Sequence, residues 1–231
     1  HEYIGEGEKM MDTNEKLSVS LKGTMDYAAL RSKWKEMLVG KASWNPTASV
    51  YVPIIERITT EAESLWTSMK QDLHHAYLWS ALNNDGSWAI TAGYTRIKQL
   101  ALAYCMIGSD LYQREDLKRC ILDALDWMYE HQYNLETEMR FNWWDFEIGV
   151  PTQLNDCMIL MYEHLSETQR SNYLGAISHF KPHVKPGHTG ANRVWDCTTL
   201  AVHGILSENP HELMMAQEGL SPVFEYAEEG D

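Results

Sequence analysis

Residues 142–165 read NWWDFEIGVPTQLNDCMILMYEHL, a polar aromatic segment that runs directly into an apolar helical pattern. The second half carries apolar side chains at intervals of three or four: Leu154, Met158, Met161 and Leu165. This spacing places them on one face of an α-helix, which has to be buried against another element. Helix packing is therefore the first structural expectation for this chain.

The same helical spacing recurs through most of the chain. Apolar stripes lie within residues 30–38, 100–111 and 117–128. Turns rich in glycine, asparagine or proline separate the stripes, at Gly40, 83–86, Gly108 and 182–190. Asn209 and Pro210 are typical of the start of a last helix, and only residues 17–21 alternate like a strand. The pattern predicts an all-α fold of antiparallel helical hairpins, arranged as a bundle, a solenoid or a closed ring.

The composition is that of a globular chain with a sizeable core. The chain has 231 residues, of which 44% are hydrophobic. No apolar run approaches the roughly 20 residues that cross a bilayer. The formal net charge of -14, without a long basic stripe, argues against binding to nucleic acid. We therefore expect neither a membrane nor a nucleic acid as a partner.

The spacing of cysteine and histidine gives no metal signature. The four cysteines form no CxxC pair and are interpreted as buried apolar residues: Cys105, Cys120, Cys157 and Cys197. The tight histidine pair, His74 and His75, does not share a helical face because the two residues are adjacent. We expect no metal and no cofactor.

Trp143 and Trp144 are neighbours in a run of carboxylates and amides. Adjacent residues project in different directions, so both rings enter one apolar layer only if the backbone bends sharply. We expect at least one ring at the surface, where an aromatic face can stack on a sugar ring. Packing of the pair between helices is the alternative, and the sequence alone favours neither interpretation.

Three segments resemble polysaccharide lyase family 8, whose members cleave hyaluronan, chondroitin or xanthan. They are residues 96–133, residues 142–156 and the run Thr189-Gly190-Ala191-Asn192-Arg193. The resemblance implies that residues 25–231 are part of an incomplete (α/α) toroid and that β-sandwich domains follow in the parent chain. It also implies an extracellular or periplasmic location. Residues 1–24 are assigned to an extended N-terminal segment.

The resemblance also implies roles for individual residues. Trp143 and Trp144 correspond to an aromatic patch that steers the polymer, with Asn142 as a polar neighbour. Asn192 corresponds to an asparagine that binds the uronate carboxylate. Removal of the C5 proton beside that carboxylate requires donors that stabilise an enolate-like transition state, and an amide supplies them without a charge. Arg193 is expected to help hold an acidic group. A helix N-cap is the alternative role of Asn192.

In the family a His and a Tyr, assisted by an Arg, supply the base for the C5 proton and the acid for the leaving oxygen. We expect these groups beyond Asp231 and interpret the 231 residues as a fragment. The chain also departs from the family at Trp195, which stands where Asp is usual, with Asp196 one place later. Substitutes for the missing groups within the chain are His183, His188, Tyr94 and Tyr133.

Two rival functions stay open at this point. A glycoside hydrolase needs two carboxylates across the scissile bond, and the candidates are Asp145, Glu147 and Asp156. A non-catalytic carbohydrate-binding or structural helical domain needs none. An acidic polymer is repelled by the negative chain at long range, so its binding requires local positive groups. The candidates for these groups are Arg140, Lys181, Lys185 and Arg193.

Overall fold

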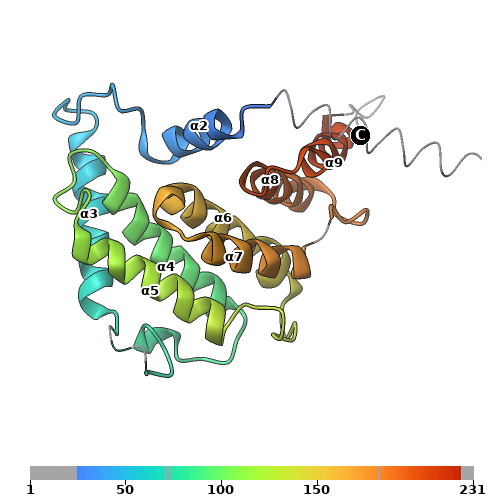
Figure 1. Ribbon diagram of the computed structural model, residues 1–231, viewed down its shortest axis with the longest axis horizontal. Helices are drawn as coiled ribbons and strands as arrows, with labels where there is room; N and C mark the ends of the chain where they lie inside the picture. Colours follow the sequence, from blue (N-terminus) through green and yellow to red (C-terminus); the bar gives the residue numbers. More distant parts are fainter. Residues whose placement is uncertain (1–24, 71, 73, 182, 225–231) are drawn as a thin grey trace, which may run out of the picture. The chain divides into compact units, whose positions relative to one another are not determined.

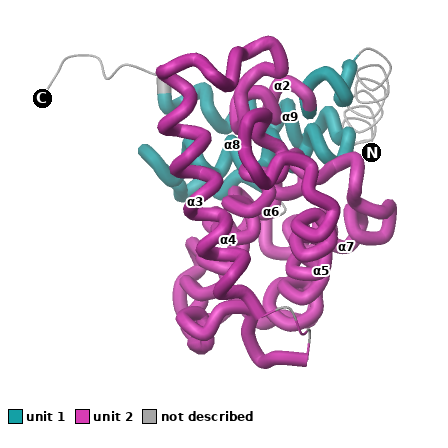
Figure 2. The backbone as a smooth tube through the Cα atoms, turned by 90° about the vertical axis from the view of Figure 1, so that its left-hand side faces the viewer, with its two compact units in different colours: residues 1–31, 183–231 teal, residues 32–182 magenta. Residues whose placement is uncertain are grey.

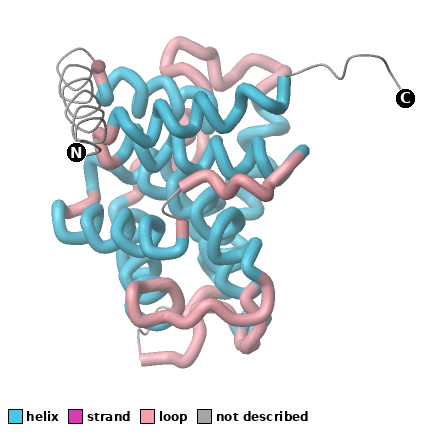
Figure 3. The backbone as a smooth tube through the Cα atoms, turned by 90° about the vertical axis from the view of Figure 1, so that its right-hand side faces the viewer, coloured by secondary structure: helices cyan, strands magenta, loops and turns pink. Residues whose placement is uncertain are grey.

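The computed structural model describes residues 25–224 except 71, 73 and 182. Within these residues every regular element is helical (Figures 1 and 3), which confirms the predicted all-α class. The strand-like alternation at 17–21 and the N-terminal segment 1–24 lie outside the described residues. The chain divides into a large unit, residues 32–182, and a small unit, residues 1–31 and 183–231 (Figure 2).

The large unit is organised around one central helix, α4 (Trp88–Cys105). It packs against α3 (Val52–Ser68), α5 (Glu115–His131) and α6 (Val150–Met161), while α7 (Glu167–Phe180) packs on α5 and α6. Contact on several sides explains why α4 is buried along most of its length. Short 3-10 turns add to this unit at Ser80–Leu82 (η1) and Tyr162–His164 (η3).

Local chemistry sets where these helices begin and end. α7 starts at a capping box, in which Ser166 Oγ accepts from the backbone of Gln169 at 3.1 Å and Gln169 Oε1 accepts from the backbone of Ser166 at 2.9 Å. Gly108, with φ of 94°, turns the chain after α4. Because α4 ends at Cys105, Ile107 lies outside the helix that its stripe predicted and is 38% exposed.

The small unit is built on α8 (Gly190–Leu206) and α9 (Pro210–Leu220), followed by the 3-10 turn η4 (Ser221–Phe224). Asn209 Oδ1 accepts from the backbone of His211 at 3.1 Å, so the start predicted for this last helix is confirmed. His203 Nδ1 lies 2.6 Å from Glu212 Oε2 and joins α8 to α9. The apolar contact between the helices is made by Cys197, Leu200 and Ala216. Helix α2 (Tyr27–Val39) contributes residues 27–31 to this unit and residues 32–39 to the large unit.

The described residues contain neither a membrane-length apolar helix nor a metal-binding cluster. No described helix is long and apolar enough to cross a membrane. No group of three or more His, Cys, Asp or Glu side chains in this part of the chain could hold a metal ion. Cys105, Cys157 and Cys197 are buried, as predicted, whereas Cys120 is only partly buried.

Candidate functional site

Asn142 opens the aromatic segment, and its hydrogen bonds define the turn that presents it. Asn142 Oδ1 accepts from the backbone of Trp144 at 3.1 Å, and the backbone N–H of Asn142 donates to Ser87 Oγ at 3.2 Å. Ser87 Oγ donates to Asp145 Oδ2 and Thr91 Oγ1 donates to Asp145 Oδ1, both at 2.7 Å. The buried carboxylate of Asp145 therefore anchors the segment to the beginning of α4.

A π-helical turn (η2, Asp145–Gly149) follows directly and leads into α6. The backbone N–H of Val150 donates to the carbonyl of Asp145, which is the i to i+5 bond of a π-helix. The carbonyl of Phe146 accepts from Tyr133 Oη at 2.8 Å, with the Tyr133 side chain fully buried. Such turns occur frequently at functional sites, where they direct the side chains around them.

Replacing Tyr133 by phenylalanine should destabilise the large unit by about 1–3 kcal/mol, because a buried carbonyl loses its hydroxyl donor. Urea unfolding followed by tryptophan fluorescence measures the change. Tyr94→Phe is the matched control, since the buried Tyr94 hydroxyl has no hydrogen-bond partner among the described residues. Equal costs for the two variants would show that the Tyr133 bond does not support the π turn.

The two tryptophans of the segment differ in their environment. Trp143 is 39% exposed, so the prediction of at least one ring at the surface is confirmed. Trp144 is half-buried and packs over Gly149, where an added Cβ would lie 2.7 Å from its ring. The expectation of a surface ring thus applies to Trp143, which faces solvent. The alternative of inward packing applies to Trp144.

Asn192 lies in the first turn of α8. The N-cap of this helix is Thr189, so the alternative role of Asn192 as N-cap is wrong. Asn192 is half-buried, and its side-chain amide makes no hydrogen bond to any described residue. Backbone N–H groups at the start of a helix also favour a negative charge. The first turn of α8 therefore combines an uncommitted amide with a local preference for anions.

The loop before α8 is held by Asp196, which is fully buried. Asp196 Oδ2 accepts from the backbone of Lys185 at 2.8 Å and lies 3.0 Å from His188 Nδ1. Arg193 Nη1 donates to the carbonyl of Lys185 at 2.9 Å. These contacts give His188 and Arg193 positions in the scaffold of the loop. Trp195, which stands where the family usually has Asp, is 46% exposed. The buried carboxylate that holds the loop comes from its neighbour Asp196.

The structure groups the predicted residues into two sets. Asn142, Trp143 and Trp144 lie together in the large unit, whereas Asn192 and Arg193 lie together in the small unit. The catalytic and binding roles of all five stay predictions. Sequence reasoning missed Ser87 and Thr91, which anchor one segment, and named Asp196 without recognising that it anchors the other. Each acts across a distance in sequence that spacing does not reveal.

Several other candidates prove to be buried. Tyr94 and Tyr133 are 1% and 0% exposed, so neither lines a cleft, and burial raises the pKa of both phenols well above the usual value. Lys181 is 3% exposed and adds no surface charge. The carboxylates considered for hydrolysis are buried as well, at Asp145, Glu147 and Asp156. Asp156 accepts from Trp34 Nε1 at 2.8 Å and pairs with Lys98 Nζ at 2.7 Å. These contacts assign Asp145 and Asp156 to the scaffold.

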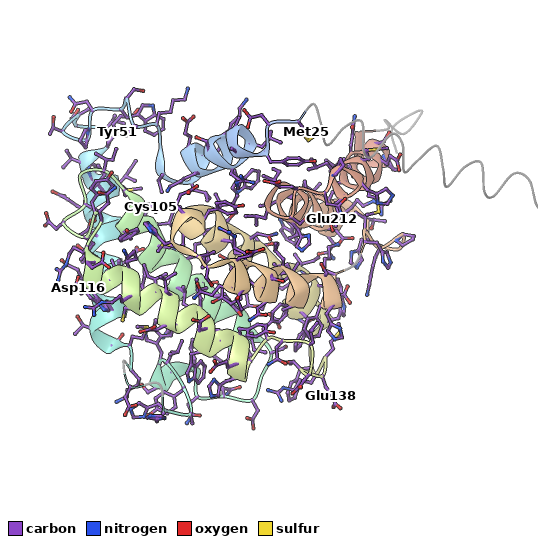
Figure 4. The ribbon with its side chains drawn as sticks, viewed as in Figure 1. Met25, Tyr51, Cys105, Asp116, Glu138 and Glu212 are labelled. Atoms are coloured by element: carbon purple, nitrogen blue, oxygen red, sulfur yellow. The ribbon has the colours of Figure 1, made fainter. Side chains whose placement is uncertain are left out.

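A cavity of about 570 Å³ lies elsewhere in the large unit. Tyr51 and Cys105, both labelled in Figure 4, contribute to its lining from different elements. Much of the remaining wall is apolar, from Leu38, Ile54, Ile55 and Ile58. None of the five predicted site residues lines this cavity. Glu138, also labelled in Figure 4, marks the separate loop that leads to the aromatic segment.

Comparison with known proteins identifies clear relatives. Residues 34–231 match the profile of the polysaccharide lyase family 8, N terminal alpha-helical domain. The chain is 35% identical over 210 residues to a xanthan lyase of Bacillus sp. (strain GL1), covering 89% of this chain and 22% of that protein. It is 30% identical over 211 residues to a hyaluronate lyase of Thermasporomyces composti, covering 89% and 26%.

Two solved structures share the fold. The Paenibacillus xanthan lyase superposes with a TM-score of 0.85 at 35% identity, over 89% of this chain and 20% of that one. The Streptomyces coelicolor A3 chondroitin AC lyase, solved in complex with chondroitin sulphate, gives a TM-score of 0.81 at 30% identity, over 89% and 28%. The predicted incomplete (α/α) toroid is confirmed. The chain spans less than a third of the length of these relatives.

Proposed function

The chain belongs to polysaccharide lyase family 8, and we propose that it takes part in cleaving a uronic-acid-containing polysaccharide by β-elimination. The substrate would be of the hyaluronan, chondroitin or xanthan type, because its relatives are xanthan, hyaluronate and chondroitin AC lyases. In this reaction a base removes the C5 proton of the uronate, the C4–O4 bond breaks, and a C4=C5 double bond forms. The departing O4 takes up a proton from an acid, so the reaction is redox-neutral and requires no oxidant.

One observation carries the proposal: the uncommitted amide of Asn192 in the first turn of α8. An ionised carboxylate makes the C5 proton only feebly acidic, because deprotonation places further negative charge next to it. An amide N–H directed at that carboxylate, near the positive end of a helix, stabilises the charge that develops in the transition state. The loop contacts of Asp196 keep this end of the helix in place.

Sugar binding is assigned to the aromatic segment. The half-exposed ring of Trp143 offers a face for stacking, Trp144 supports it, and Asn142 holds the turn through its bond to Trp144. Arg193 would hold an acidic group of the polymer with donors other than the Nη1 that binds Lys185. The stacking contact would set the register of the sugar chain.

The base and the acid are proposed to come from residues beyond Asp231, in the remainder of the toroid domain. Tyr94 and Tyr133 are too buried to serve, and His188 is engaged by Asp196. The proposed partners are an acidic polysaccharide and the C-terminal domains of the parent chain, with no nucleic acid and no membrane. We place the protein outside the cytoplasm, in the extracellular or periplasmic space where such polymers occur.

Ultraviolet absorbance tests the reaction, because the new double bond is conjugated to the carboxylate. The full-length gene product and the 231-residue chain are each mixed with hyaluronan, chondroitin, xanthan and alginate. A rise in absorbance with the full-length protein establishes elimination and names the substrate. New reducing ends without absorbance would point to hydrolysis. Binding without either product would make this a carbohydrate-binding domain.

Trp143→Ala should raise KM by about 10-fold and change kcat little, because stacking on a sugar face is equally strong in the ground state and the transition state. Steady-state kinetics on the preferred polymer measure both constants. Trp66→Ala, at a ring of the same unit that is not part of the aromatic segment, is the control and should leave KM unchanged. An unaltered KM in Trp143→Ala would assign the ring to packing.

A further inference from the structure

We propose that Phe141, together with Arg140, forms an additional subsite for an acidic sugar next to Trp143. This inference rests on the proposed function, because the occupant is the same polymer. Phe141 precedes Asn142 and is one of three non-glycine residues with positive φ among the described residues, at 62°. That backbone conformation is disfavoured for a bulky side chain and persists only where the surroundings hold it.

The surroundings that hold Phe141 are the contacts of the next residue. The backbone of Asn142 is tied to Ser87 and its side chain to Trp144, while Ser87 is tied in turn to the buried Asp145. This network determines the path of the chain through residue 141. Glycine would adopt the same φ without strain, so the presence of phenylalanine calls for a reason that lies in the ring.

Packing within the protein does not provide that reason. The side chain of Phe141 is 75% exposed, more than any other large apolar side chain described. Among the described residues its ring makes no aromatic contact, and a surface ring with so little cover gains little from folding. A ligand that covers the ring on binding would recover the hydrophobic contribution that the folded chain leaves unused.

The neighbouring groups indicate which ligand fits. A phenyl ring has no polar edge and suits the C–H face of a pyranose. Trp143, two residues further on, presents a second exposed ring. Arg140 is exposed and forms no ion pair within 4.0 Å in the described structure, although Glu136 and Glu138 lie nearby in sequence. A guanidinium beside an aromatic ring matches a sugar that carries a carboxylate or sulfate.

Phe141→Gly provides the test because it should act in opposite directions on folding and binding. Gln113→Gly is the matched control, since Gln113 also has positive φ (53°) and lies outside the aromatic segment. Both variants relieve backbone strain, so their melting temperatures should equal or exceed that of the parent chain. Only Phe141→Gly should weaken binding of hyaluronan, chondroitin or xanthan fragments, by about 5- to 10-fold. Phe141→Tyr should restore the affinity.

The outcomes separate this subsite from the lyase activity. Binding is measured by calorimetry on the full-length protein, and absorbance is followed in parallel. If the parent protein binds a fragment but forms no unsaturated product, the lyase proposal fails, while a loss of affinity in Phe141→Gly still supports the subsite. An unchanged affinity in Phe141→Gly, or an equal loss in Gln113→Gly, overturns the subsite. Absence of binding to every fragment overturns both proposals.

Discussion

Replacement of Asn192 by alanine is expected to lower kcat of the proposed elimination in the full-length protein by about 10²–10³-fold, comparable to the loss of one oxyanion donor. The amide is proposed to act on the charge that develops at the uronate carboxylate, so the effect should appear mainly in kcat. Initial rates of absorbance increase, measured across a range of substrate concentrations, give kcat and KM separately.

Stability provides the control for this experiment. The Asn192 amide makes no hydrogen bond to the described residues, and alanine is a better helix former, so the variant should melt at the temperature of the parent protein or above it. Asn192→Asp should be at least as inactive, because a second carboxylate would repel the uronate. A kcat that stays at the parental value in Asn192→Ala would remove Asn192 from the mechanism.

Asp156→Ala is expected to be the most destabilising of the substitutions considered, by about 3–5 kcal/mol. It removes the partner of Lys98 and the acceptor for Trp34 Nε1, and the side chains of Lys98 and Asp156 are only 19% and 9% exposed. The ammonium of Lys98 would then be left without its carboxylate in a largely dry environment. Urea unfolding of the chain, followed by circular dichroism, measures the loss.

An ion pair whose carboxylate is exposed serves as the comparison. Glu115 and Lys118 are also separated by 2.7 Å, but Glu115 is mostly exposed, so Glu115→Ala should cost far less than Asp156→Ala. Asp156→Asn keeps an acceptor for Trp34. Its loss of unfolding free energy should lie between the losses in Glu115→Ala and Asp156→Ala. Similar unfolding free energies for Asp156→Ala and the parent chain would show that the buried pair contributes little to the stability of the large unit.

Much of the fold was predictable because helix formation is a local property. The stripe of residues 117–128 became α5 with its apolar face buried, and Asn209 with Pro210 began α9 as expected. The error at Ile107 has an equally local cause. Apolar spacing continued past the point where α4 ends, and spacing alone does not show where the backbone turns.

The candidate site was predictable in its residue types but less so in its details. The Asn-Trp-Trp segment and the Gly-Ala-Asn run were identified from the sequence, yet Asn192 proved to be inside the helix instead of at its cap. From the sequence, the carboxylates of Asp145 and Asp156 were candidates for the acid and base of glycoside hydrolysis. Both are used as internal anchors, because hydroxyl, indole and ammonium groups from distant helices reach them.

The sequence by itself determined the helical class, several helix ends, the family and the residues on which a lyase proposal depends, since all of these follow from local spacing and short motifs. Only the tertiary structure decided which tryptophan faces solvent, which carboxylates are buried, and that Phe141 is exposed on a strained backbone. The physical reason is the range of the interactions. Periodicity and capping act within a few residues, whereas burial and hydrogen-bond partnership arise when segments far apart in the chain meet.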